Sequence, residues 1–363
     1  MSNSHTHAHS FAQKIKRTIV ILSIIVLAVL GYSIVVNPLE MDLSSVQRFI
    51  TFFLSMLVQS FPFLLAGTFV SSIIHFCVPE SFITKILSAR DIRAIPAALF
   101  AAICLPVCDC ASVPVASRLL KKGASLTSVV TYMLASPILN PVVIASTFYA
   151  FPDYRPIVAA RIALGVFVPV VVGLILSRVF RSFPVVAKAA TESCSCGCDH
   201  AHEEEEHIHE DHCEEEHKDC HSYKDRIISI LIHTGEEFVY VSPFIIAGAA
   251  VSALVQVAVP REALLLTSAT SRFFIQPAIM IAAAFVLSVC STSDAFIARG
   301  FSSAFSHGSI LGFMVAGPML DIKNVLMMIL YFRKRFIVVL AVVVVSVTYL
   351  SAVLVSLLFF GAH

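Results

Sequence analysis

The chain has 363 residues, of which 58% are hydrophobic and only 13% charged, and its mean hydropathy is +0.87. This composition excludes an ordinary soluble domain and predicts an all-α polytopic membrane protein. The formal net charge of +1 hides a segregation, since half of the 24 acidic residues lie between Glu192 and Asp219. The sequence contains no basic, aromatic-rich patch, so we do not expect nucleic-acid binding.

Five segments follow one another along the chain. The N-terminal segment is polar and contains alternating histidines, and the second begins with an apolar run that is long enough to span a bilayer and has no clear signal-peptidase site after it. Two membrane regions then flank a loop of Cys, His and acidic residues. We place the segments at residues 1–17, 18–48, 49–181, 182–226 and 227–363.

Two polar stretches interrupt segments that are otherwise apolar enough to cross a membrane. Residues 104–110 read Cys-Leu-Pro-Val-Cys-Asp-Cys, and residues 290–294 read Cys-Ser-Thr-Ser-Asp. Thiols and carboxylates are costly in hydrocarbon and normally face a cavity or a partner, so these stretches are candidate halves of one substrate site. The candidate substrate contacts are Cys104, Cys108, Asp109, Cys110, Asn140, Cys290, Ser291, Ser293, Asp294 and Asp321.

Plainer interpretations stay open for several of these residues. Cys104 is equally well explained as a small packing residue. The hydroxyl groups of the second stretch can satisfy backbone groups, and Arg299 is a candidate ion-pair partner for Asp294. Asn140 and Asp321 either line the same cavity or shape a helix break.

The second membrane region repeats the first. Residues 60–67 match residues 241–248 around a shared Pro-Phe and Ala-Gly, and residues 135–140 match residues 316–321. Cys108 also matches Cys290 with a shift of only one more residue. Transporters are commonly built from such repeats, with the site at corresponding broken helices of the two halves.

The positive-inside rule chooses between two topologies. If both cysteine-containing segments cross the membrane, 14 of the 25 Lys and Arg residues fall inside, whereas 19 of 25 do if both are re-entrant hairpins. Re-entry gives about seven spans and two hairpins whose arms are too short to cross alone. The repeats are then inverted and the two tips meet near the midplane. The alternative is about nine simple spans with parallel repeats.

The central loop carries the most specific metal signal. Its thirty residues from Glu192 to His221 hold seven His, five Cys and twelve acidic residues. Thiolate and imidazole donors at this short spacing predict a low-affinity metal buffer or delivery strap rather than a structural zinc finger. The alternative is a solvated acidic linker. The candidate ligands are Cys194, Cys196, Cys198, His200, His202, His207, His209, His212, Cys213, His217, Cys220 and His221.

The repeat pair, the Cys-Asp-Cys before Ala-Ser-Val-Pro and the Ser-Pro-Ile-Leu-Asn-Pro stretch resemble the predicted-permease family that includes the ArsP-type organoarsenical efflux permeases. The Cys/His-rich loop is similar to that of its copper/zinc efflux branch. The resemblance covers roughly residue 49 to the C-terminus without most of the loop. It implies an inner-membrane permease that exports a toxic metal or metalloid, with Cys108 and Cys110 as substrate contacts.

We therefore expect a secondary efflux permease for copper or zinc, which are substrates rather than cofactors. The sequence contains no P-loop of the form GxxxxGK[ST], so we do not expect an ATP-driven pump. It also contains no His-Glu-x-x-His helix, so we do not expect an enzyme. Candidate proton carriers are Asp109, Asp294 and Asp321. The expected partners are the ion, the lipid bilayer and, as an open alternative, further copies of the chain. The N-terminus and the central loop are expected in the cytoplasm. The alternatives are a permease for trivalent organoarsenicals and a membrane-anchored metal sensor or chaperone.

Overall fold

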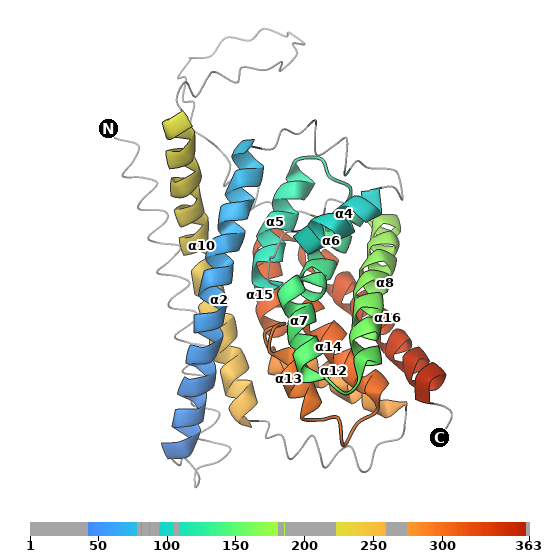
Figure 1. Cartoon of the computed structure of the whole chain (residues 1–363). Coiled ribbons are helices and arrows are strands. Elements are labelled where there is room, and N and C mark those ends of the chain that lie inside the picture. The colour runs from blue at the N-terminus through green and yellow to red at the C-terminus, as the bar shows by residue number, and fades with distance from the viewer. Residues whose placement is uncertain are drawn as a thin grey trace, which may run out of the picture.

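The computed structural model describes residues 43–77, 81, 87, 94–104, 109–180, 185, 223–258 and 274–360. These residues form helices joined by short turns, as the composition predicts (Figure 1). Six helices precede the central loop and six follow it within this described part of the chain. The first six are α2 (Leu43–Cys77), α4 (Ala94–Cys104), α5 (Asp109–Lys121), α6 (Leu126–Leu139), α7 (Pro141–Ala150) and α8 (Arg155–Val179). The second six are α10 (Tyr223–Ala258), α12 (Ile275–Leu287), α13 (Asp294–Arg299), α14 (His307–Met319), α15 (Ile322–Tyr331) and α16 (Lys334–Phe360).

The long helices α2 and α10 lie side by side along one flank of the molecule and run in opposite directions (Figure 1). Each contains a proline, Pro62 in α2 and Pro243 in α10, and each continues through it. Large apolar side chains such as Val58 and Leu231 point outward from the pair. An apolar outer surface on long helices is what a lipid environment requires.

Helices α4 and α5 form a hairpin whose two ends meet. The backbone N–H of Ser125, just after α5, donates to the carbonyl of Leu87, before α4, at 2.9 Å. Lys122 Nζ also donates to the carbonyl of Ile74, near the C-terminal end of α2, at 2.7 Å. With 11 and 13 residues, neither arm is long enough to cross a bilayer alone.

Helices α12 and α13 form a second hairpin at the opposite end of the bundle. Gln276, at the start of α12, accepts through Oε1 from the backbone N–H of Ser306, after α13, at 3.2 Å. Arg299, at the end of α13, donates to the carbonyl of Ala150, the last residue of α7, at 3.2 Å. Because α6 starts at the base of the first hairpin and α7 ends at the base of the second, the two hairpins enter from opposite ends (Figure 1).

Two helix pairs cross the bundle between the hairpin bases. Helices α6 and α7 are bent by 41° at Asn140, and α14 and α15 are interrupted at Leu320 and Asp321. Of the two interpretations of Asn140 and Asp321, the helix boundaries agree with the one in which they lie at helix breaks. Pro137 and Pro318 stay inside helices, so neither of these prolines ends one.

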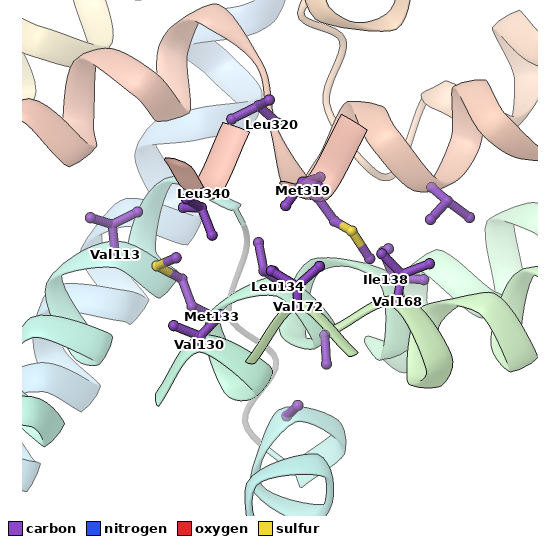
Figure 2. Close-up of a cluster of buried hydrophobic side chains, with 14 of the residues drawn as sticks. Val113, Val130, Met133, Leu134, Ile138, Val168, Val172, Met319, Leu320 and Leu340 are labelled. Carbon is purple, nitrogen blue, oxygen red and sulfur yellow. The ribbon is translucent and has the colours of Figure 1, made fainter. Parts of the chain in front are cut away.

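The core lies where the two halves pack together. Met133 of α6 and Val168 of α8 share a buried apolar cluster with Met319 of α14 and Leu340 of α16 (Figure 2). Each side chain is nearly inaccessible to solvent. The cluster holds the crossing helices together.

By length and composition, the described residues contain five helices able to cross a membrane, or six if the bent α6–α7 pair counts as one span. The multi-pass all-helical prediction is confirmed at this level. The predicted first span within residues 18–48 and every candidate ligand of the central loop lie outside the described residues.

Candidate substrate site

The tip of the first hairpin is the N-terminus of α5, which begins at Asp109. Asp109 is only 2% exposed, and its carbonyl accepts a hydrogen bond from Ser112 Oγ at 2.8 Å. A carboxylate in the first turn is favourable because the helix N-terminus carries partial positive charge. Cys104 ends α4 and is exposed. Cys108 and the side chain of Cys110 lie outside the described part.

The tip of the second hairpin is a tight turn. Helix α12 is followed by its cap residue Ser288, whose φ of 48° is left-handed, a conformation that non-glycine residues rarely adopt. The carbonyl of Cys290 then accepts from the backbone N–H groups of Ser293 at 2.9 Å and Asp294 at 3.0 Å. Gln256 of α10 supports the turn by donating through Nε2 to the carbonyl of Leu287 at 2.7 Å.

The two tips are close enough to interact electrostatically. The charge of Asp109 acts on both Cys290 and Asp294, and the charge of Lys323 on α15 also acts on Cys290. Helices α5 and α15 are in contact. Lys323 is buried at 4% exposure, so the first tip, the second tip and α15 place acids, a thiol and a cation in one interior region. The structure thus brings together Asp109, Cys290 and Asp294 from the predicted set.

Asp294 is held by Arg161 of α8. Arg161 Nη1 donates to Asp294 Oδ1 at 3.0 Å, and Nη2 donates to Oδ2 at 2.5 Å. The side chains are 2% and 3% exposed, so the bidentate pair is fully buried. Arg161 Nη1 also donates to Thr147 Oγ1 of α7 at 2.7 Å.

The expected alternative of an Arg299–Asp294 pair is wrong. Arg299 instead approaches Asp153 at 3.4 Å in the turn between α7 and α8, and both side chains are largely exposed. Arg299 is five residues after Asp294 and ends the short helix α13, whereas Arg161 comes from the first half of the chain.

Asn140 and Asp321 are helix caps. Asn140 Oδ1 accepts from the backbone N–H of Val142 at 2.9 Å, and Asp321 Oδ1 accepts from that of Asn324 at 2.6 Å. Asp321 Oδ2 also lies 3.5 Å from Lys323 Nζ. Both residues therefore shape the breaks between crossing helices, and Asp321 reaches the site through Lys323.

The hydroxyl groups of the second tip have separate surroundings. Ser293 Oγ donates to Gln59 Oε1 of α2 at 3.4 Å, and Thr292 Oγ1 donates to Cys290 Sγ at 3.5 Å. Ser291 is buried. Through Gln59 and Gln256, both α2 and α10 reach the second tip.

Removing the Asp321 cap is expected to lower the free energy of unfolding by more than removing the Asn140 cap does. Asn140→Ala loses one capping bond, worth about 0.5–2 kcal/mol of the free energy of unfolding. Asp321→Ala loses the equivalent bond and also the carboxylate beside buried Lys323, which raises the cost of burying that charge. Thermal unfolding of the purified variants checks this order. Equal losses, or full recovery in Asp321→Asn, would show that the carboxylate contributes nothing beyond capping.

Sequence reasoning missed Arg161, Thr147, Lys323 and the glutamines that support the second tip. A lone arginine within an apolar span is itself a signal, because such a charge normally faces the protein interior. Among the described residues, no group of three or more His, Cys, Asp or Glu side chains is arranged to hold a metal ion.

Comparisons with known proteins bear on the family of this chain. A family model described as ArsP_1, a predicted permease, matches residues 45–357. The UPF0718 protein YcgR of Bacillus subtilis (strain 168) is 34% identical over 313 residues, which cover 86% of this chain and 98% of that protein. A putative two-component membrane permease complex subunit of Streptococcus mutans serotype c is 29% identical over 294 residues, covering 81% and 90%. No solved structure matches the chain significantly.

Proposed function

Because the chain belongs to the ArsP_1 family of predicted permeases, we propose that it exports a soft heavy-metal ion, copper or zinc, between the tips of its two hairpins. It does so as a secondary permease of the plasma membrane and not as an enzyme. The observation that carries the proposal is that Asp109 is near enough to Cys290 and Asp294 for its charge to act on both, although the bases of their hairpins lie at opposite ends of the bundle.

The element order supports inverted repeats. A long helix, a hairpin, an interrupted crossing helix and a final long helix occur in the same order before and after the central loop. Helices α2 and α10 run in opposite directions (Figure 1). Two re-entrant hairpins of this kind give a site that one half can open to one face and the other half to the opposite face.

The substrate class follows from the donors at the tips. Cys290 supplies a thiol beside two buried carboxylates, and Cys108 and Cys110 flank Asp109 in the sequence. Thiolates prefer copper(I), zinc and trivalent arsenic over hard cations. The Cys/His-rich loop, which we place in the cytoplasm, favours copper or zinc by concentrating donors for these ions near the entrance.

A transport assay in a metal-sensitive host tests the proposal. Wild type is expected to lower cellular copper or zinc. Cys290→Ser and Cys108→Ala/Cys110→Ala are expected to lose at least about tenfold of the export rate, since even residues that only support a metal ligand contribute that much. Ser302→Ala, which removes an exposed hydroxyl near the base of the same hairpin, serves as the control.

Other outcomes identify the alternatives. If only methylarsenite export responds to the cysteine variants, the substrate is an organoarsenical. If deletion of residues 192–221 abolishes all metal-dependent effects while the cysteine variants change nothing, the chain is a membrane-anchored sensor or chaperone. A requirement for a second chain would extend to this protein the complex named for the Streptococcus mutans relative.

A further inference from the structure

A second polar cluster lies within the helical bundle, apart from the hairpin tips. Arg118 of α5 donates to Glu237 of α10 through Nη2 at 2.9 Å and through Nε at 3.4 Å. Arg118 Nη2 also lies 3.4 and 3.3 Å from the two ring nitrogens of His233, one helical turn before Glu237. Ser71 Oγ of α2 donates to Glu237 Oε1 at 3.5 Å. We call these four residues the Arg118 cluster.

The Arg118 cluster is largely buried and joins the three helices α2, α5 and α10. The side chains of Arg118 and Glu237 are 13% and 7% exposed, and Glu237 and His233 belong to an apolar span of α10. Arg118 Nη1 is buried without a hydrogen-bond partner in the described structure. Ionisable residues in such a position are costly to keep and usually serve function.

The cluster is connected to the substrate site by a single helix, α5, which continues through Pro114. Arg118 is near the C-terminal end of α5, and Asp109 is the first residue of the same helix. Nine residues of α-helix span about 14 Å, so the cluster is distinct from the tip. A shift of Arg118 nonetheless moves α5 and the tip carboxylate with it.

We propose that the Arg118 cluster is the proton-binding site that couples a proton gradient to movement of the first hairpin. The proposal rests on the proposed permease function. The ring nitrogens of His233 face Arg118 Nη2. A proton taken up by His233 places a second positive charge against the guanidinium, so acidification loosens α5 from α10 and deprotonation restores the tie.

The other titratable groups around the Arg118 cluster do not reverse the direction of this pH effect. Glu236 and Tyr240 lie on α10 and Tyr331 lies on α15, and Arg118, Glu236 and Glu237 all act electrostatically on His233. Glu236 is exposed to the outside of the bundle. The two tyrosines stay neutral across the range in which histidine titrates.

Hydrogen–deuterium exchange of the purified full chain tests the proposal without any substrate. At pH 8, Glu237→Gln removes the carboxylate that holds Arg118 and is expected to speed exchange of the α5 amides at residues 113 and 115–121 at least about tenfold over wild type. At pH 5.5 the two proteins are expected to differ by less than about threefold, because protonation of His233 is then expected to loosen the same contact in wild type. Comparing proteins at one pH removes the intrinsic pH dependence of exchange.

Two further variants keep the test decisive. Glu236→Gln changes the neighbouring exposed acid and is expected to behave as wild type at both pH values. His233→Gln is expected to reduce the acid-induced loosening. Exchange in Glu237→Gln equal to wild type at pH 8 overturns the proposal. So does an excess that persists unchanged at pH 5.5, since that marks a purely structural contact.

Proteoliposomes loaded with copper(I), zinc or methylarsenite supply the transport readout. Glu237→Gln is expected to keep substrate exchange at equal concentrations within about twofold, while pH-gradient-driven accumulation falls at least about tenfold. Accumulation that still follows the gradient overturns the coupling role. If none of the three substrates moves in wild type, the proposed function fails, while the exchange experiment still decides the role of the cluster.

Discussion

Arg161→Met is expected to lower the free energy of unfolding by about 3–5 kcal/mol, because it leaves the carboxylate of Asp294 buried without its counter-charge. In the structure this carboxylate receives two hydrogen bonds from Arg161 and is 3% exposed. Water cannot replace them without opening the contact between α8 and α13. Thermal unfolding of the protein in detergent or lipid nanodiscs measures the loss.

The chain offers a matched control for this substitution. Arg299 also forms an ion pair, with Asp153, but those side chains are 44% and 84% exposed. Arg299→Met is expected to change stability by less than about 1 kcal/mol, as exposed pairs usually do. If both arginine variants unfold alike, burial of the Arg161–Asp294 pair has no energetic consequence.

A double variant separates stability from transport. In Arg161→Met/Asp294→Leu both charges are gone, and apolar replacements of a buried pair are often neutral or stabilising. Folding is therefore expected to recover. Export is expected to stay at least about tenfold below wild type, because the second tip lacks its carboxylate. Recovery of both properties would make the pair a purely structural tie.

Gly67→Ala is expected to destabilise the protein by about 1–3 kcal/mol and to impair export. A Cβ on Gly67 of α2 would lie 2.0 Å from the Cβ of Ala111, in the first turn of α5. The alanine methyl cannot rotate away, so α2 and α5 must separate. Ala111 is two residues after Asp109, and the displacement reaches the tip directly. Thermal unfolding and the export assay measure the two effects.

Two variants check that crowding is the cause. Gly235→Ala on α10 meets nothing within 4 Å and is expected to stabilise the protein by about 0.5–1 kcal/mol through helix propensity. Gly67→Ala/Ala111→Gly moves the methyl group to the opposite helix and is expected to regain most of the lost stability and export. A Gly67→Ala protein as stable and active as Gly235→Ala would contradict the close approach.

The helix breaks were predictable because their cause is local or repeated. Pro141 disfavours helical backbone at the residue before it, and Asn140 is indeed extended, with φ −56° and ψ 128°. No proline follows Asp321, and only its match to Asn140 in the other half predicts the second break. Short apolar arms and the distribution of basic residues predict that the two cysteine-containing segments re-enter the membrane, and this topology stays a prediction.

The ion pairs were not predictable in the same way. Asp294 and Arg161 are separated by 133 positions, and Arg118 and Glu237 by 119, so no local spacing indicates which charges meet. Arg299 was the nearest cation in sequence and was the wrong partner. The left-handed Ser288 also gives no sequence signal, because glycine is the residue expected in that conformation.

The separation of Arg161 from Asp294 also bears on how the protein is made. A ribosome that adds about 5–20 residues per second needs roughly 7–27 s to synthesise the 133 positions between them. During that interval α8 can enter the bilayer with an uncompensated arginine, at a cost of roughly 2.5–3.5 kcal/mol on insertion scales. Helix α8 is therefore expected to remain beside the insertion machinery until the second hairpin arrives. The first half alone should then insert poorly into the membrane. Chains truncated before Asp294 should be preferred substrates for membrane proteases.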